Sequence, residues 1–437
     1  MKLGYLSAAA LLGSGAHAKG GSHNPSDRVL KAGAPESVGM LADPLKQMVE
    51  NFTDFTVARN YGDATHNATH PLEPGSANIV ARHGVVVSEF AVGHRNLYSD
   101  ANGTCLDPAD QEDTTLDTVY DMASLSKLFC AIAVLREVDS GRIDLEETVA
   151  SYLPEFGSNG KEEITIIDLL THTSGLYPDP IPGLWMSNYT SIDERVHALL
   201  TLRPQEPRGT AFIYSDINFM TLRYVLEEVT GMSYDRLIYS YTMPLGMRST
   251  FFNRGNVEGP SNPYYSRSAP TEFQIDVQGP LEPQRPQPVR GTVHDENAWS
   301  LDGVSGHAGV FSTVGDMAIF CQMILNNGTY NHHRILSPEA VDLIFTDFNG
   351  KFPGSNYGTG FALNQTITQG PMRSMQTAGH TGFTGTTLAI DRPSDTFWLH
   401  LANRVHPSRE WSSNNPVRMA MGYWVGKSLG KDVEWPN

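Results

Sequence analysis

The stretch DMASLSKLFC, residues 121–130, contains the pattern Ser-x-x-Lys at Ser124 and Lys127, at the head of an apolar segment. Apolar residues recur every three to four positions over 128–138, and Gly141 supplies a helix stop. Residues three apart share a helix face, so the Lys127 amine can reach the Ser124 hydroxyl. Burial removes the solvation of an ammonium group and lowers the pKa of a lysine toward that of a useful base. The stretch therefore predicts an activated serine nucleophile at the start of a buried helix.

Two other Ser-x-x-Lys matches, at Ser158–Lys161 and Ser428–Lys431, make the pattern alone a weak signal. The first has a glycine inside a turn, and the second lies at the end of the last expected helix. Both are therefore expected at the solvated surface. For Ser124 the alternative to a nucleophile is a helix cap followed by a surface lysine, so the rest of the chain has to decide.

Composition restricts the classes of function that the chain can serve. Its 437 residues, 40% hydrophobic and 18% charged, are typical of a soluble globular protein large enough for two structural units. The formal net charge of −17 argues against nucleic acid and anionic membranes, because these partners require a basic face. We therefore expect a small-molecule substrate. The oligomeric state is left open.

The N-terminal sequence predicts secretion. Residues 1–18 combine a lysine, a short apolar run and an Ala-His-Ala end, as in a signal peptide, and 19–35 is expected to be a flexible lead-in. No apolar run reaches the roughly 18 to 20 residues that span a bilayer, so no membrane anchor is expected. Six sequons predict N-glycosylation in a eukaryotic secretory pathway, at Asn51, Asn67, Asn102, Asn188, Asn327 and Asn364. The cysteines allow at most one disulfide bond: Cys105, Cys130 and Cys321.

Strand-like segments lie near both ends of the chain, and helical segments fill its middle. A hairpin is predicted around His83-Gly84, and two strands are predicted in TTLAI and TFWLHLA before the last helix. The fold class is therefore predicted as α+β, with an antiparallel sheet flanked by terminal helices and built from residues 36–123 and 350–437. Residues 124–349 are expected to form a mostly helical region with a long Pro/Gly-rich loop at about 251–295. A crevice is expected between the two units.

Two further residues lie in contexts that suit acid–base chemistry. Tyr214, just before an expected helix, can act as an acid or base if a cation such as Lys127 stabilises its phenolate. His380 is expected to open a strand among glycines, which allow a ligand to approach closely. Each has a structural alternative: a half-buried, hydrogen-bonded aromatic for Tyr214 and a satisfied edge-strand histidine for His380.

Four motifs occur in a fixed order: Ser124-x-x-Lys127, LLTHTSGL at 169–176, Tyr214-Ser215-Asp216 and His380-Thr381-Gly382. Together they resemble the serine β-lactamase-related superfamily, which includes class C β-lactamases, D-Ala-D-Ala carboxypeptidases, D-aminopeptidases and lactamase-like esterases and acyltransferases. The resemblance runs from about residue 36 to the C-terminus and implies a β-lactamase/transpeptidase-like fold. Other stretches, including VRGTVHDENAWSLDGVSGHAGVFST at 289–313, resemble an uncharacterised secreted branch of that superfamily.

The resemblance implies a role for each matching residue. Ser124 would be acylated, and Lys127 with Tyr214 would deprotonate it and then protonate the leaving group. The backbone N–H groups of Ser124 and Phe383 would form an oxyanion hole. Four residues would bind substrate: Asp216, His380, Thr381 and Gly382.

Two of these positions depart from the pattern of the superfamily. Asp216 stands where many relatives have asparagine, and His380 stands where lactamases and carboxypeptidases usually carry lysine. Because histidine is mostly neutral near pH 7, it does not offer a substrate carboxylate the fixed positive charge that lysine would. The departures favour an ester or amide substrate without an obligatory carboxylate, and activity is expected to rise as His380 loses its proton.

These features predict a secreted serine hydrolase, an esterase or amidase that acts through an acyl-enzyme on Ser124. The alternatives are an acyltransferase or transesterase that uses the same site, and a β-lactamase or D-amino-acid peptidase acting on a lactam or amide. A non-catalytic binding protein is disfavoured because Ser124, Lys127 and Tyr214 are all present. No metal-binding motif occurs, so neither metal nor cofactor is expected. His307 could line the crevice and the segment 290–296 could contact substrate, but we favour a packing role for His307 and an anchoring role for the segment within the long loop.

Overall fold

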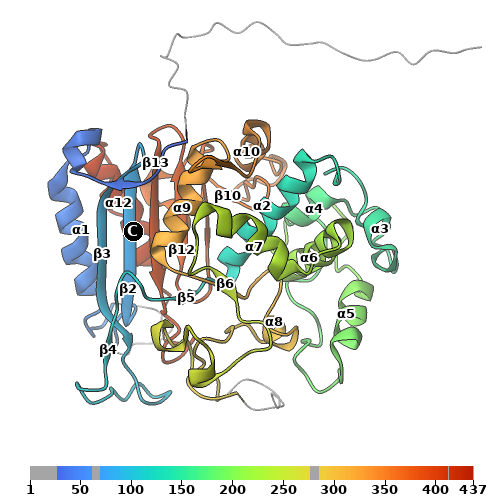
Figure 1. Ribbon diagram of the computed structural model, residues 1–437, viewed down its shortest axis with the longest axis horizontal. Helices are drawn as coiled ribbons and strands as arrows, with labels where there is room; N and C mark the ends of the chain where they lie inside the picture. Colours follow the sequence, from blue (N-terminus) through green and yellow to red (C-terminus); the bar gives the residue numbers. More distant parts are fainter. Residues whose placement is uncertain (1–26, 62–68, 276–284, 412, 437) are drawn as a thin grey trace, which may run out of the picture.

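The structure is a computed structural model that describes residues 27–436 except 62–68, 276–284 and 412. A central sheet has helices on both faces, and a helical region lies to one side of it (Figure 1). The predicted signal peptide, residues 19–26 of the lead-in and the Asn67 sequon lie outside the described residues.

The main sheet joins the two ends of the chain, as predicted. Its eight strands follow the order β1-β3-β2-β13-β12-β11-β10, with β4 paired to β3. The antiparallel pairing of β13 with β2 runs from Thr396 opposite Arg82 to Ala402 opposite Ser76. The hairpin predicted around His83-Gly84 is the β2–β3 pair. The strands are β1 (Lys31–Ala32), β2 (Gly75–Arg82), β3 (Val85–Asn96), β4 (Glu112–Asp113), β10 (Ala362–Leu363), β11 (Thr377–Thr381), β12 (Thr387–Asp391) and β13 (Thr396–Ala402).

Two small sheets complete the β structure. The first orders three strands as β5-β7-β6 beside the predicted nucleophile, and the second is a hairpin of β8 and β9. Their bounds are β5 (Tyr120–Asp121), β6 (Phe251–Phe252), β7 (Val310–Ser312), β8 (Thr329–Tyr330) and β9 (His333–Arg334).

Twelve helices are found in the described part of the chain. They are α1 (Ala42–Phe55), α2 (Ser126–Asp139), α3 (Val149–Tyr152), α4 (Ile166–Leu170), α5 (Ile192–Thr201), α6 (Asp216–Thr230), α7 (Tyr234–Leu245), α8 (Glu296–Ser300), α9 (Val314–Leu325), α10 (Pro338–Ile344), α11 (Thr366–Gln369) and α12 (Asn415–Ser428). In this region, none of them combines the length and the hydrophobicity needed to cross a bilayer.

Alternate residues of the central strands face two different cores. Val80 and Trp398 pack with α1 and α12 on one face, whereas Ile79 and Phe397 belong to the larger core that includes α2 and α6. This is the period of two expected for a sheet buried on both faces. Helix α9 packs on β2 and β13, although it comes from the segment predicted to be mostly helical. That helix links the sheet to the helical region, and a boundary at residue 349 stays a prediction.

Three sequence-based expectations differ from the structure. The sequence ITIIDLLTHTSGL predicts a helix that begins with a Thr165–Asp168 capping box and ends at Gly175. Helix α4 has the capping box but ends at Leu170, because His172 has a φ of +60° and its ring accepts the Ser215 N–H just before α6. His380 lies at the end of β11, not at the start of a strand. Lys161 is fully buried, not solvated, because its amine donates to the Leu200 carbonyl.

The predicted glycosylation sites differ in exposure. Asn102 and Asn188 are exposed, whereas Asn327 and Asn364 are half-buried. Asn51 is also half-buried, and its side-chain oxygen accepts a hydrogen bond from Trp424 at 3.0 Å. The three cysteines are free thiols, so no disulfide bond links them.

Candidate active site

Ser124 lies in a tight turn between β5 and α2. Ala123, just before it, has a φ of +46°, and its N–H donates to the Asp121 carboxylate at 2.8 Å. Residues 123–125 form a 3-10 turn, η2 (Ala123–Leu125), and α2 begins at Ser126. Ser124 therefore lies in the 3-10 turn that leads directly into the buried helix, next to a residue with a strained left-handed backbone.

Lys127 makes the contact with Ser124 that the spacing suggested. Its Nζ lies 2.8 Å from Ser124 Oγ, 2.7 Å from Asp216 Oδ1 and 3.4 Å from the His307 carbonyl oxygen. The side chain is fully buried. An ammonium group is a donor only, and the atoms of all three neighbours can accept from it.

The expectation that the pKa of Lys127 lies below the ordinary lysine value is wrong. Burial does lower the pKa, but the negative charge of Asp216 and the interaction with Tyr214 raise it more, so the pKa lies above the usual lysine value. The ammonium therefore donates to Ser124 Oγ, and the serine keeps its own proton. The spacing in the sequence predicted the contact between Lys127 and Ser124, but the charge of Lys127 depends on the neighbouring Asp216 carboxylate.

Tyr214 is held over the lysine by aromatic contacts. Its ring centroid lies 4.8 Å from Lys127 Nζ and 4.5 Å from the ring centroid of His172, and its hydroxyl interacts with Ser124 and Lys127. Burial raises the pKa of Tyr214, while the Lys127 ammonium lowers it and Asp216 raises it. The phenol is thus the second acid–base group that reaches Ser124.

Asp216, predicted to bind substrate, forms an ion pair with Lys127 at the first position of α6. Its side chain is 18% exposed and still lines a cavity. The helix N-terminus stabilises a carboxylate at this position. The structure therefore places Asp216 mainly among the groups that set the charge of Lys127.

His380 is buried and neutral. Its Nδ1 lies 2.7 Å from the Thr381 carbonyl, which can only accept, so Nδ1 carries the proton. Nε2 is then an acceptor, and it has no hydrogen-bond partner in the described part of the chain. Burial and the Lys127 ammonium lower the pKa of His380 to about 3. An activity rise from its deprotonation would thus fall far below neutral pH, not near the ordinary histidine pKa.

Gly382 and Phe383 lie beside the nucleophile turn. A side chain at Gly382 could not fit, because its Cβ would lie 2.6 Å from the Met122 carbonyl oxygen and 2.1 Å from Thr386 Oγ1. Within the described ranges, the Phe383 N–H donates no hydrogen bond to the protein. This amide is available to a substrate oxygen, as an oxyanion hole requires.

Two cavities meet at Ser124. One, of about 440 Å³, is largely apolar and includes His380, Thr381, Gly382 and Arg418. The other, of about 790 Å³, is lined by several acidic residues, including Asp179, Asp216 and Asp295. Ser124, Tyr214 and Phe383 line both cavities. The structure thus brings together the predicted site residues and opens a separate space on each side of the serine.

Sequence reasoning missed several residues of this site. His172 accepts the Ser215 N–H at 3.0 Å and positions the Tyr214 ring, although it was visible in the LLTHTSGL motif. His307, interpreted as a packing residue, is buried in the wall of the acidic cavity. Partial loss of solvent and the nearby Asp216 and Asp295 raise the pKa of Asp179 to about 6. No local pattern marks His307 and Asp179 as neighbours of Ser124, because they come from distant segments.

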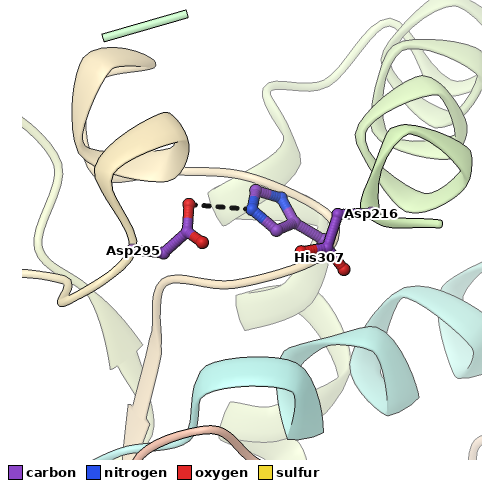
Figure 2. Close-up of side chains that lie close together, drawn as sticks. All are labelled: Asp216, Asp295 and His307. Atoms are coloured by element: carbon purple, nitrogen blue, oxygen red, sulfur yellow. Dashed lines mark hydrogen bonds and ion pairs between the residues drawn. The ribbon is translucent and has the colours of Figure 1, made fainter. Parts of the chain in front are cut away.

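Asp216, Asp295 and His307 are the residues in the described ranges whose ligand atoms are close enough to hold a metal ion, within 4.8 Å of one another (Figure 2). Their charges already have partners. Lys127 lies against Asp216, and His307 Nε2 lies 2.9 Å from Asp295 Oδ1. A metal ion there would have to displace or repel these cationic groups.

Comparison with known proteins gives a consistent result. The Beta-lactamase family model matches residues 65–421. The chain is 33% identical over 343 residues to a Salmonella paratyphi B protein described as "Putative D-alanyl-D-alanine carboxypeptidase", covering 73% of this chain and 77% of that protein.

Two solved structures have similar folds. EstCE1, a hydrolase with promiscuous acyltransferase activity, matches with a TM-score of 0.63 at 20% identity, covering 87% of this chain and 98% of that chain. Simvastatin synthase (LovD) from Aspergillus terreus matches with a TM-score of 0.64 at 18% identity, covering 89% and 99%.

Proposed function

The chain belongs to the β-lactamase family, and from that premise we propose that it is a serine hydrolase that cleaves an ester or amide through an acyl-enzyme on Ser124. The observation that carries the proposal is the 2.8 Å contact between Lys127 Nζ and Ser124 Oγ, next to the Tyr214 hydroxyl and at the junction of two cavities. A buried lysine and tyrosine around one serine are the parts that nucleophilic catalysis needs.

In the proposed mechanism the competent Lys127–Tyr214 pair has lost one proton. Tyr214, as a phenolate stabilised by the Lys127 ammonium, takes the Ser124 proton while Oγ attacks the substrate carbonyl. The N–H groups of Ser124 and Phe383 hold the oxyanion. Tyr214 then returns the proton to the leaving group as the C–O or C–N bond breaks. Water then attacks the acyl carbonyl carbon and gives a proton to Tyr214, and Tyr214 passes that proton to Ser124 Oγ as the C–Oγ bond breaks and the acid is released.

The substrate proposal follows from the charges around Ser124. A neutral His380 offers an acceptor, not a positive charge, and the second cavity carries several carboxylates. The carboxylates disfavour a substrate carboxylate in the acidic cavity. On the other side of Ser124, His380 supplies no charge for one, so that among the described residues only Arg404 and Arg418 bring positive charge to that cavity. We therefore propose a small neutral ester or amide as the substrate.

Acyl transfer is the second candidate, because the space on each side of Ser124 can hold an acyl group and an accepting alcohol or amine at the same time. Measuring how the acyl-enzyme partitions between water and added alcohols separates the two reactions. Hydrolysis predicts that the free acid remains the main product.

The direct test is labelling with a fluorophosphonate followed by peptide mapping, together with a screen of short-chain nitrophenyl esters, a chromogenic cephalosporin and D-amino-acid amides. We expect the label on Ser124 and turnover of the esters. Ser158→Ala is the matched control, since it alters another Ser-x-x-Lys pattern. Labelling of a different serine would contradict the proposal.

Secretion is a separate proposal that rests on the N-terminal sequence and the sequons. Expression in a eukaryotic host should give a protein in the medium that starts after Ala18 and loses mass on glycosidase treatment. Exposed Asn102 and Asn188 are the sites we expect to be occupied first. A protein that stays inside the cell and still carries residues 1–18 would contradict the secretion proposal.

A further inference from the structure

We propose that His307, held by Asp295, is a positioning residue that offsets the charge of Asp216 and so lets the Lys127–Tyr214 pair release the proton that Ser124 activation requires. The inference rests on the proposed function and assigns a catalytic purpose to the segment 289–313, which the mechanism above does not use.

The His307 imidazole is fixed on both nitrogens. Nε2 lies 2.9 Å from Asp295 Oδ1, and Nδ1 lies 2.9 Å from Ser305 Oγ. Asp295 is itself fixed, because it caps α8 by accepting the Ala298 N–H at 2.7 Å. Figure 2 shows the imidazole between Asp295 and Asp216, with its ring edge turned to Asp295.

His307 also touches the lysine directly. Its backbone carbonyl lies 3.4 Å from Lys127 Nζ, so the same residue fixes the ammonium from one side and faces its counter-ion from the other. The side chain is 1% exposed, so solvent does little to screen these charges.

The charged groups that face His307 come from four segments. They are Asp295 before α8, Asp216 on α6, Lys127 on α2 and Asp179 in the loop after α4. Burial lowers the pKa of His307, but Asp295 and then Asp216 raise it more than Lys127 lowers it, so the net direction is upward. An imidazolium between two carboxylates is the charge state that this geometry favours.

The imidazolium changes what Lys127 experiences. With it in place, two carboxylates share one positive charge besides Lys127. Without it, the full negative charge of Asp216 acts on Lys127 and Tyr214, and both residues hold their protons more tightly. The Lys127–Tyr214 pair must lose one proton before Ser124 is activated. Loss of His307 should therefore shift the ascending limb of the pH–rate profile to higher pH.

The test compares His307→Gln in two backgrounds by pH profiles of kcat/KM. In the natural background we expect the ascending limb to shift to higher pH by about one unit or more, and kcat/KM at pH 7 to fall about tenfold or more. In Asp216→Asn, where the charge to be offset is gone, the same change should have little further effect. An equal loss in both backgrounds, or no shift, would overturn the proposal.

Three measurements keep the outcome decisive. His307→Lys, which keeps the positive charge, should restore most of the lost rate, and exposed His333→Gln is the control. The imidazole ¹⁵N spectrum of the unaltered protein should show His307 charged at pH 7. A neutral His307 contradicts the inference even if no variant folds. Fluorophosphonate labelling tests the proposed function separately: if Ser124 is labelled but the pH profile of His307→Gln is unchanged, this inference fails while the proposed function stands.

Discussion

Two Ser-x-x-Lys patterns of this chain, at Ser124–Lys127 and Ser158–Lys161, end in lysines that are both fully buried. Lys127 has a carboxylate at 2.7 Å, and its pKa is raised. Lys161 donates to the Leu200 carbonyl and lies 4.3 Å from the Phe156 ring centroid, and burial lowers its pKa to about 8. Burial acts in the same direction on both lysines, so the partner decides the outcome.

The two Ser-x-x-Lys patterns also differ in whether the lysine contacts the serine. Ser124 lies one turn before a buried helix, so Lys127 folds back onto its hydroxyl. Ser158 instead donates to the Glu155 carbonyl, and Lys161 points to a different segment. The lysine with the lowered pKa is the one without a serine beside it. A low lysine pKa alone therefore does not identify the site.

The largest effect should come from the two serines. Ser124→Ala removes the nucleophile and should lower kcat/KM for a nitrophenyl ester by about 10³-fold or more. Ser158→Ala should leave it unchanged, because that hydroxyl only closes a local turn. Steady-state kinetics on matched preparations measure both. Comparable activity in the two variants would contradict the assignment of Ser124, rather than Ser158, as the nucleophile.

The two lysines should differ almost as strongly. Lys127→Met should lower kcat/KM by about 10² to 10⁴-fold, since it removes a group that shares the proton transfer. Lys161→Met should keep the activity of the unaltered protein. Circular dichroism shows whether each variant is folded. A loss of activity in folded Lys161→Met would mean that the second lysine also serves the site.

Removing the carboxylate should make the first lysine resemble the second. Asp216→Asn leaves burial as the main influence on the pKa of Lys127, so the ascending limb of the kcat/KM profile should move to lower pH by about one unit or more. The sign follows because Asp216 raises the pKa of both Lys127 and Tyr214. A limb that stays in place would show that neither group titrates there.

The smallest effect concerns stability. The folded pKa of Lys161, about 8, lies below its ordinary value of 10.5, so the folded state binds fewer protons between these pH values. The free energy of unfolding of the unaltered protein should therefore increase as the pH rises from about 8 to 10.5. Lys161→Met should be more stable near pH 7, with an advantage that shrinks toward pH 10. Thermal melts at several pH values measure the difference, and a constant gap would contradict the lowered pKa.

Local patterns predicted much of the fold. Period-two and period-3.6 spacing located the hairpin, the C-terminal strands and the long helices, because side-chain burial follows these periods. Short α4 and the position of His380 at a strand end were misjudged, since His172 and the pairing of β11 with β12 fix them through distant partners.

The sequence by itself determined the α+β class, the serine with its lysine one helical turn away, and the order of the site motifs, because each depends on spacing within one segment. Only the tertiary structure decided the charges. Asp216, Asp295 and His307 come from separate elements and meet within 4.8 Å. Electrostatic interactions depend on distance and burial rather than on sequence separation, so the protonation of Lys127 is a property of the folded chain.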